Sequence, residues 1–181
     1  MKKLKFITGN KSKHEEAREI ISGLERVDYD LPEIQSLDPK EIISIKLEEA
    51  IKIQKGNFIV EDTSLFIESL NGFPGPLIKW FLKSLGNDGI YELVKDRVNK
   101  KVRVVCMIGM IYHGDLSFYK SEIKGEISKP LGENGFGWDP IFRPSDSKKT
   151  FGQMLPKEKE KYNMRVAALL KLKKALLPKR K

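Results

Sequence analysis

The segment VRVVCMIGMIY, at positions 102–112, constrains the fold more than any other stretch of this sequence. Nearly all of its residues are apolar, and a run of this kind is typical of a β-strand that is buried on both faces. Strand-like and helix-like patterns interleave along the rest of the chain. We therefore predict an α/β fold in which helices flank a long mixed sheet.

A length of 181 residues is enough for one domain with a substantial core and too short for two comfortable ones, so we expect a single domain over 1–181. Strand patterns cover 4–8, 58–67, 102–112, 116–127 and 141–142, and helix patterns cover 11–24, 39–54, 77–85, 88–98 and 156–177. Two helix starts are explicit. Ser12 with Glu15 suits a capping box, and Asp38 followed by Pro39 suits an N-cap with proline at the first helical position.

Composition argues against several classes of protein. No apolar run approaches the roughly 20 residues of a membrane span, and we expect neither a span nor a secretory leader. Cys106 is the sole cysteine, so no intramolecular disulfide can form, which suits the cytoplasm. The net charge of +9, with an especially basic end at 171–181, suits anionic partners, although the interleaved acidic residues favour an ordinary solvated surface.

The junction FITGNKSK, which joins the first strand pattern to the first helix pattern, has two interpretations. A turn made by Gly9 and Asn10 before a capped helix explains it structurally. Alternatively, a strand that enters a helix through a small polar turn aims backbone N–H groups and the positive end of the helix dipole at one point, where a phosphate can bind. Neither GxxxxGK[ST] nor GxGxxG is present, so the segment alone leaves both interpretations open.

Two adjacent acids, Glu61 and Asp62, interrupt an apolar strand pattern, and we expect them where the strand ends, at the edge of the sheet. Side by side in apolar surroundings they would repel each other, and a hard cation such as Mg²⁺ would relieve that repulsion. The alternative is an N-terminal capping role for Asp62, Thr63 and Ser64. Glu41 is a second acidic candidate, although a capping glutamate also belongs at the third helical position.

The glycine-rich loop GENGFGWDPIF carries two aromatic side chains, Phe136 and Trp138, on which a base could stack for about 1–3 kcal/mol. Asp139, fixed by the proline that follows, could accept hydrogen bonds from a base or a ribose. A hydrophobic plug that closes the core is the structural alternative. In the last helix pattern, an apolar stripe of leucines continues back to Arg165, which could donate to a purine carbonyl or a phosphate, or form an internal salt bridge.

In this order, the segments resemble the inosine triphosphate pyrophosphatase family, also called the Ham1-like family. The residues that match its opening and central segments are Thr8, Gly9, Asn10, Lys13, Glu16, Glu61, Asp62, Thr63, Leu65, Asn71, Gly72, Pro74 and Gly75. Those that match its later segments are Phe136, Gly137, Trp138, Asp139, Pro140, Phe142, Thr150, Met154, Lys159 and Arg165. The matches span most of the chain, in the family's order and spacing.

The resemblance implies a two-lobed fold with a nucleotide cleft between the lobes, and a homodimer. It implies Mg²⁺-dependent hydrolysis of non-standard purine nucleoside triphosphates (ITP, dITP and XTP) to the monophosphate and pyrophosphate. Such an enzyme binds its nucleoside triphosphate without needing nucleic acid or a membrane.

The resemblance also implies a role for each matched residue. Asp62 and Lys13 would be catalytic, and Glu41 with Asp62 would hold the metal. The nucleotide would be bound by Thr8, Gly9, Asn10, Lys13, Lys46, Thr63, Phe136, Trp138, Asp139, Lys159 and Arg165. Lys13, Lys46 and Lys159 would supply positive charge around the phosphates, and Arg165 would belong to the base pocket.

Three departures from the family pattern concern selectivity. Asn163 and Met164 stand where the family has Ser-His, Ser64 replaces a glycine, and the segment 76–78 replaces a small residue followed by Tyr-Ser. Methionine cannot donate a hydrogen bond to a purine, so loss of the histidine could relax base discrimination by about 1–3 kcal/mol. The alternatives are therefore a triphosphate pyrophosphatase with another or a broad base preference, or a nucleic-acid-binding relative without catalysis.

Overall fold

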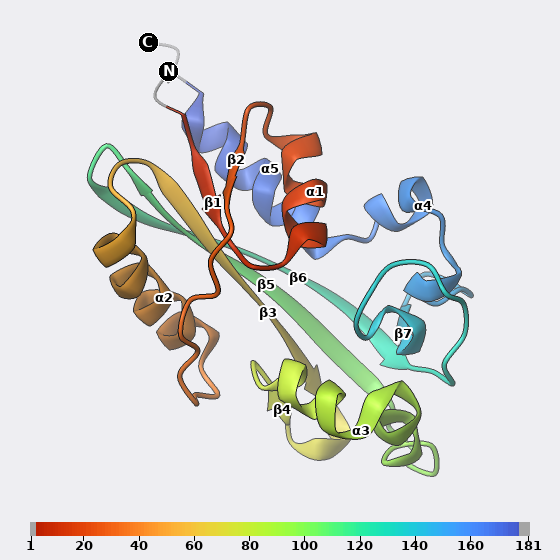
Figure 1. The fold of residues 1–181 in the computed structure, drawn as a ribbon. Coiled ribbons are helices and arrows are strands. Elements are labelled where there is room, and N and C mark those ends of the chain that lie inside the picture. Colours follow the sequence, from red (N-terminus) through yellow and green to blue (C-terminus); the bar gives the residue numbers. More distant parts are fainter. Residues whose placement is uncertain (1–2, 178–181) are drawn as a thin grey trace. The chain divides into compact units, whose positions relative to one another are not determined.

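A seven-stranded sheet forms the framework of the protein, with the strand order β2-β1-β3-β5-β6-β7 and with β4 paired to β3 (Figure 1). The computed structural model describes residues 3–177. The strands are β1 Lys5–Ile7, β2 Glu25–Val27, β3 Phe58–Ile67, β4 Pro74–Gly75, β5 Lys101–Tyr112, β6 Asp115–Ile127 and β7 Phe142–Pro144. The helices are α1 Lys11–Ile20, α2 Pro39–Ile53, α3 Ile78–Glu92, α4 Pro156–Glu160 and α5 Met164–Leu176.

The sheet is mixed, as predicted. Strands β2 and β3 both pair parallel to β1, whereas β4 pairs antiparallel to β3 and β7 pairs antiparallel to β6. Strand β5 is buried along most of its length, which confirms the prediction from its apolar run. None of the helices within residues 3–177 is long and apolar enough to cross a bilayer.

The chain divides into two compact units. The first contains the described parts of 1–62, 106–121 and 165–181, and the second contains 63–105 and 122–164. The long strands β3, β5 and β6 contribute residues to both units.

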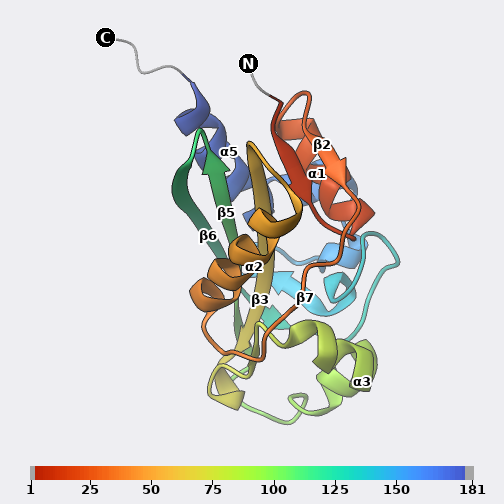
Figure 2. The same ribbon diagram turned by 60° about the vertical axis from the view of Figure 1, so that its left-hand side comes forward.

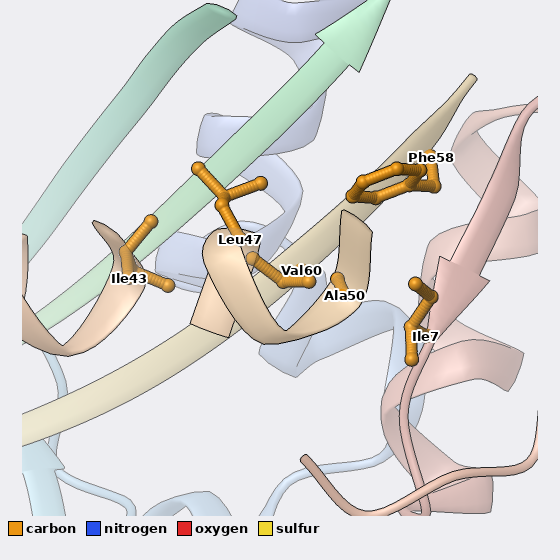
Figure 3. Close-up of a cluster of buried hydrophobic side chains, with 6 residues drawn as sticks. All are labelled: Ile7, Ile43, Leu47, Ala50, Phe58 and Val60. Carbon is orange, nitrogen blue, oxygen red and sulfur yellow. The ribbon is translucent and has the colours of Figure 1, made fainter. Parts of the chain in front are cut away.

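In the first unit, α2 packs on one face of the sheet through an apolar cluster (Figure 3). The cluster consists of Ile7, Ile43, Leu47, Ala50, Phe58 and Val60. Gly109 of β5 permits this close approach, because a Cβ atom there would lie 2.6 Å from side-chain atoms of both Ile43 and Leu47. Helix α5 lies on the other side of these strands (Figures 2 and 3), so β3, which is buried along most of its length, is covered on both faces.

In the second unit, aromatic packing organises the segment around β7. Phe142 and Phe151 are fully buried, and the ring of Trp138 packs edge-on against Phe142 and stacks on Phe151. Helix α3 is interrupted at Gly86, whose φ of 66° and ψ of 179° are not helical. The predicted break at this glycine is therefore confirmed, although its second helical part ends at Glu92 and not near position 98.

Two local predictions were wrong, and strand β2 was missed. Asn10, not Ser12, caps α1, because its side chain accepts the Lys13 backbone N–H at 3.1 Å. Strand β2 was not predicted, because three partly buried residues show too little alternation to reveal a strand. The final helix is two helices, α4 and α5, since the chain turns at 161–163 and Asn163 directly precedes α5. The last four residues of the basic end, 178–181, lie outside the described residues.

Candidate active site

The two acids of β3 lie within the strand and face opposite sides of the sheet. Strand β3 runs from Phe58 to Ile67, as its pattern over 58–67 predicted, so the expectation that the two acids mark the strand's end and the alternative capping role are both wrong. Side chains alternate along a strand, and Phe58 and Val60 pack toward α2, so Asp62 faces α2 while Glu61 faces away from it. The two carboxylates therefore have separate partners and do not share one cation as their adjacency suggested.

Both acids nevertheless lie at an edge of the parallel part of the sheet. Strand β1 ends at Ile7, and its parallel register with β3 pairs Phe6 with Ile59. Glu61 and Asp62 thus lie just beyond the carboxyl end of β1, where the chain turns through 8–10 into α1. Ligands of α/β proteins bind at this kind of edge.

On the α2 face, a buried ammonium group joins two carboxylates. Lys46 Nζ lies 2.8 Å from Asp62 Oδ1 and 3.1 Å from Glu33 Oε1, and Lys46 and Asp62 are 6% and 8% exposed. Burial alone would lower the pKa of Lys46, but the charges of Asp62 and Glu33 outweigh it and raise this pKa above its usual value. Lys46 is therefore a fixed positive charge near the carboxyl end of β1.

Glu33 is a site residue that the sequence analysis missed. It lies between β2 and α2 in a segment without helix or strand, so no periodic pattern marks it. One sequence signal could have indicated this segment, because Leu31 is an apolar residue two positions before Glu33. In the structure Leu31 packs against the apolar cluster beneath α2. The predicted acid, Glu41, lies in the first turn of α2, is exposed, and accepts a hydrogen bond from Ser36 Oγ.

On the opposite face, Glu61 is surrounded by cations. Arg165 Nε donates to Glu61 Oε2 at 2.6 Å and Arg165 also pairs with Glu16, while Lys13 Nζ lies 3.2 Å from Glu61 Oε1. Burial would lower the pKa of Arg165, but the charges of Glu61 and Glu16 raise it well above its usual range, so the guanidinium stays charged. The structure therefore shows the internal salt bridge that was the alternative role for Arg165.

Cys106 lies near this charged cluster without being a reactive group. Burial raises the pKa of its thiol well above the usual value, and the charge of Glu61 adds to this, against the opposing charges of Arg165 and Lys13. The thiol is therefore protonated and packs as a small apolar side chain.

The turn after β1 is held by its own side chains and by Arg26. The backbone N–H of Asn10 donates to Thr8 Oγ1 at 3.1 Å, and Arg26 donates to the carbonyl oxygens of Thr8 and Gly9 at 3.1 and 3.0 Å. A Cβ atom at Gly9 would lie 2.4 Å from the Asp30 carboxylate, so only glycine allows that side chain to approach so closely. Arg26, which no sequence motif indicated, also pairs with Asp28.

A second cluster lies in the second unit. Asp139 Oδ2 accepts from the Phe136 backbone N–H at 2.8 Å and from Lys159 Nζ at 2.7 Å, and Asp139 is 3% exposed. The Lys159 ammonium also lies 5.2 Å from the ring centres of Phe136 and Phe151. Lys159, predicted to join Lys13 and Lys46 at the phosphates, is therefore placed with the aromatic residues predicted to bind the base.

Thr63 and the residues that depart from the family pattern lie in β3 or at the starts of helices α3 and α5. Thr63 is half-buried and Ser64 fully buried, both within β3, so Ser64 crowds no turn. Leu77 precedes α3 and Ile78 is its buried first residue, while Met164 is buried at the first position of α5. Among residues 3–177, no three His, Cys, Asp or Glu side chains gather into a group that could hold a metal by themselves.

Comparison with known proteins identifies the family. The model of the Ham1 family matches residues 4–175. An inosine triphosphate pyrophosphatase from Schizosaccharomyces pombe is 37% identical over 93% of this chain and 92% of its own length. A dITP/XTP pyrophosphatase from Methanopyrus kandleri is 39% identical over 92% of each chain. The solved structure of a HAM1 protein from Coxiella burnetii superposes with a TM-score of 0.80 at 25% identity, covering 96% of this chain and 98% of that one. The chain therefore belongs to the Ham1 family.

Proposed function

We propose that this protein hydrolyses non-standard purine nucleoside triphosphates to the monophosphate and pyrophosphate. The observation that carries the proposal is the buried Lys46 ammonium, held between Glu33 and Asp62 just beyond the carboxyl end of β1. A buried positive charge with carboxylates beside it, next to a strand–turn–helix junction, suits a triphosphate bound together with a cation. The names of the curated relatives support the same reaction.

The proposed chemistry is attack by water on the α-phosphorus. Asp62 takes a proton from the attacking water, the bond from the α-phosphorus to the bridging oxygen breaks, and pyrophosphate leaves with that oxygen. Lys13 and Lys46 offset the negative charge of the phosphates, and the backbone of Thr8, Gly9 and Asn10 orients them. Because such a reaction depends mainly on position and charge, rigidly held ammonium groups suit it.

A divalent cation, for which we propose Mg²⁺, fits the carboxylates of the first unit. Glu33 and Asp62 already converge on one positive charge, the Lys46 ammonium, and Mg²⁺ is typically bound by one or two carboxylates together with substrate phosphates. When bound, Mg²⁺ would stabilise charge on the transferring phosphate. We therefore propose Glu33 with Asp62 as its protein ligands, in preference to Glu41, which is exposed in the first turn of α2.

Replacement of Glu33 separates these two assignments. Glu33→Gln is expected to raise the Mg²⁺ concentration that gives half-maximal pyrophosphate release by about tenfold or more, because one charged ligand is lost. Glu41→Gln is the matched control and should leave it within about twofold. Mn²⁺ binding followed by electron paramagnetic resonance gives a readout that does not depend on turnover. If the half-maximal Mg²⁺ concentration rises in Glu41→Gln and not in Glu33→Gln, then Glu41 is the metal ligand, as the sequence predicted.

For the base, we propose the cluster of the second unit, with the rings of Phe136 and Trp138 as stacking surfaces and with Asp139 and Lys159 as polar contacts. Thr63 remains a proposed nucleotide contact. Arg165 is reassigned to support of Glu61, because its guanidinium is buried and paired twice.

The resemblance also supports a cytoplasmic homodimer, which sedimentation equilibrium of the full chain would test.

A different base preference is the second candidate function, and one observation favours it. Met164 is buried and offers no hydrogen-bond donor where the family has histidine. Pyrophosphate release should therefore be measured with ITP, XTP, GTP, ATP, dUTP and dTTP. We expect ITP and XTP to be the best substrates, with discrimination against GTP. Preference for another base would leave the reaction in place and change the substrate, whereas no release from any nucleotide would refute the proposed function.

A further inference from the structure

The amide of Asn87 ties helix α3 to the loop that carries the two candidate base-stacking rings. Asn87 Nδ2 donates to the carbonyl oxygen of Gly137 at 3.0 Å, across 50 positions of the sequence. Gly137 lies between Phe136 and Trp138 and has a φ of 66°. Both partners belong to the second unit.

The interruption of α3 places Asn87 for this contact. Gly86 leaves the helical conformation, and Asn87 is the next residue, at the start of the second helical part. The first part of α3 reaches the same glycine, since a Cβ atom on Gly137 would lie 3.8 Å from Leu82 Cδ2. Both parts of α3 therefore face Gly137.

The other side of the loop is held by Asp139. Its carboxylate accepts from the Phe136 backbone N–H and from Lys159, and it packs against Gly135, where a Cβ atom would lie 2.0 Å from Asp139 Oδ2. Asp139 thus fixes the peptide before Phe136, and Asn87 fixes the peptide between Gly137 and Trp138. The two contacts lie on either side of Phe136, and the second one directly precedes Trp138.

The orientation of the Asn87 amide follows from its surroundings. Its Nδ2 must face the Gly137 carbonyl, because the reverse orientation would place two acceptors against each other. Its Oδ1 is buried and has no hydrogen-bond partner within the described part of the chain. A buried acceptor without a partner is unfavourable, so the hydrogen bond from Nδ2 to Gly137 must offset this cost.

We propose that Asn87 is a positioning residue for base recognition, which sets the orientation of Phe136 and Trp138 through the Gly137 carbonyl. The inference rests on the proposed function, because it assigns the base to this loop. Met164 offers no donor to a base, so under this proposal base discrimination depends on the shape of the aromatic loop, and that shape depends on Asn87. Asn87 touches no reacting atom, so it acts on binding and not on the chemical step.

The test uses tryptophan fluorescence of the full chain. The sequence holds two tryptophans, so Trp80→Phe leaves Trp138 as the sole reporter. In that background, Asn87→Asp replaces the donor by an acceptor of the same shape. We expect the Kd for inosine monophosphate and the KM for ITP to rise about tenfold, as for the loss of one hydrogen bond, while kcat stays within about threefold. The ratio of kcat/KM for ITP over GTP should fall.

Asn99→Asp is the matched control, because Asn99 Nδ2 also donates to an exposed acceptor in the same unit, Glu68 Oε2, at 2.9 Å. The proposal is overturned if the Kd of Asn87→Asp lies within about twofold of this control, or if Trp138 emission in the parent does not respond to inosine monophosphate. A fall in kcat with unchanged KM would also overturn it. If the parent binds the monophosphate but releases no pyrophosphate from ITP, the proposed function fails and the Kd comparison still decides the role of Asn87.

Discussion

Asp62→Asn is expected to lower the rate of pyrophosphate release from saturating ITP about a thousandfold, within the range for loss of a general base. The amide has nearly the same shape as the carboxylate but cannot take a proton from water. The variant should still fold, because Lys46 keeps its ion pair with Glu33 and the amide oxygen can accept from the same ammonium. Steady-state assays with Mg²⁺ in excess measure the effect.

Two controls separate loss of chemistry from loss of structure. Asp115→Asn changes an exposed carboxylate at the start of β6 and should retain full activity. Binding of inosine monophosphate, followed by Trp138 fluorescence, should change less than about threefold in Asp62→Asn, because the monophosphate needs no base. If Asp62→Asn keeps more than about a tenth of the parent rate, the proton acceptor is another group and our assignment of Asp62 is wrong.

Much of the fold could be predicted because local patterns and burial agree. The apolar run of β5 indicated a buried strand, and Asp38 with Pro39 marked the start of α2, where the Asp38 side chain accepts the Lys40 backbone N–H at 2.9 Å. The break in the last helix could not be predicted, because the stripe of residues at steps of three and four continues across it. Asn163, a residue typical of helix starts, was the one local signal of that break.

The site was harder to predict, because its residues meet through the sheet and not through the sequence. Neighbours such as Glu61 and Asp62 suggested a shared cation, yet strand alternation places them on opposite faces with separate partners. Glu33, in contrast, reaches Lys46 from an irregular segment that carries no periodic signal. Sequence patterns thus indicated which acidic and basic residues belong to the candidate site. Which acid pairs with which base depends on the register of the strands and on the paths of the loops, and the patterns do not contain that information.

Replacement of Arg165, a buried cation that pairs with two carboxylates, should destabilise the protein strongly. Arg165→Met is expected to lower the free energy of unfolding by about 3–5 kcal/mol, because it removes the nearer of two cations that contact a buried carboxylate. Glu61, which is 6% exposed, would keep its contact with Lys13. Urea denaturation followed by circular dichroism measures the change, provided that the slope against denaturant stays constant.

Arg103→Met is the matched control, since Arg103 Nη1 lies 3.7 Å from Glu122 Oε2 and both side chains are more than a third exposed. Loss of this exposed ion pair should lower the free energy of unfolding by less than about 1 kcal/mol.

The double variant Arg165→Met with Glu61→Met should be more stable than Arg165→Met alone. It removes the carboxylate that the single change leaves buried, and neutral replacement of a buried pair is tolerated. If instead Arg165→Met is no less stable than Arg103→Met but binds inosine monophosphate at least about tenfold more weakly, Arg165 contacts the base. The guanidinium would then have to leave Glu61 for the nucleotide, and the buried pair would be a resting state of the site and not its structural support.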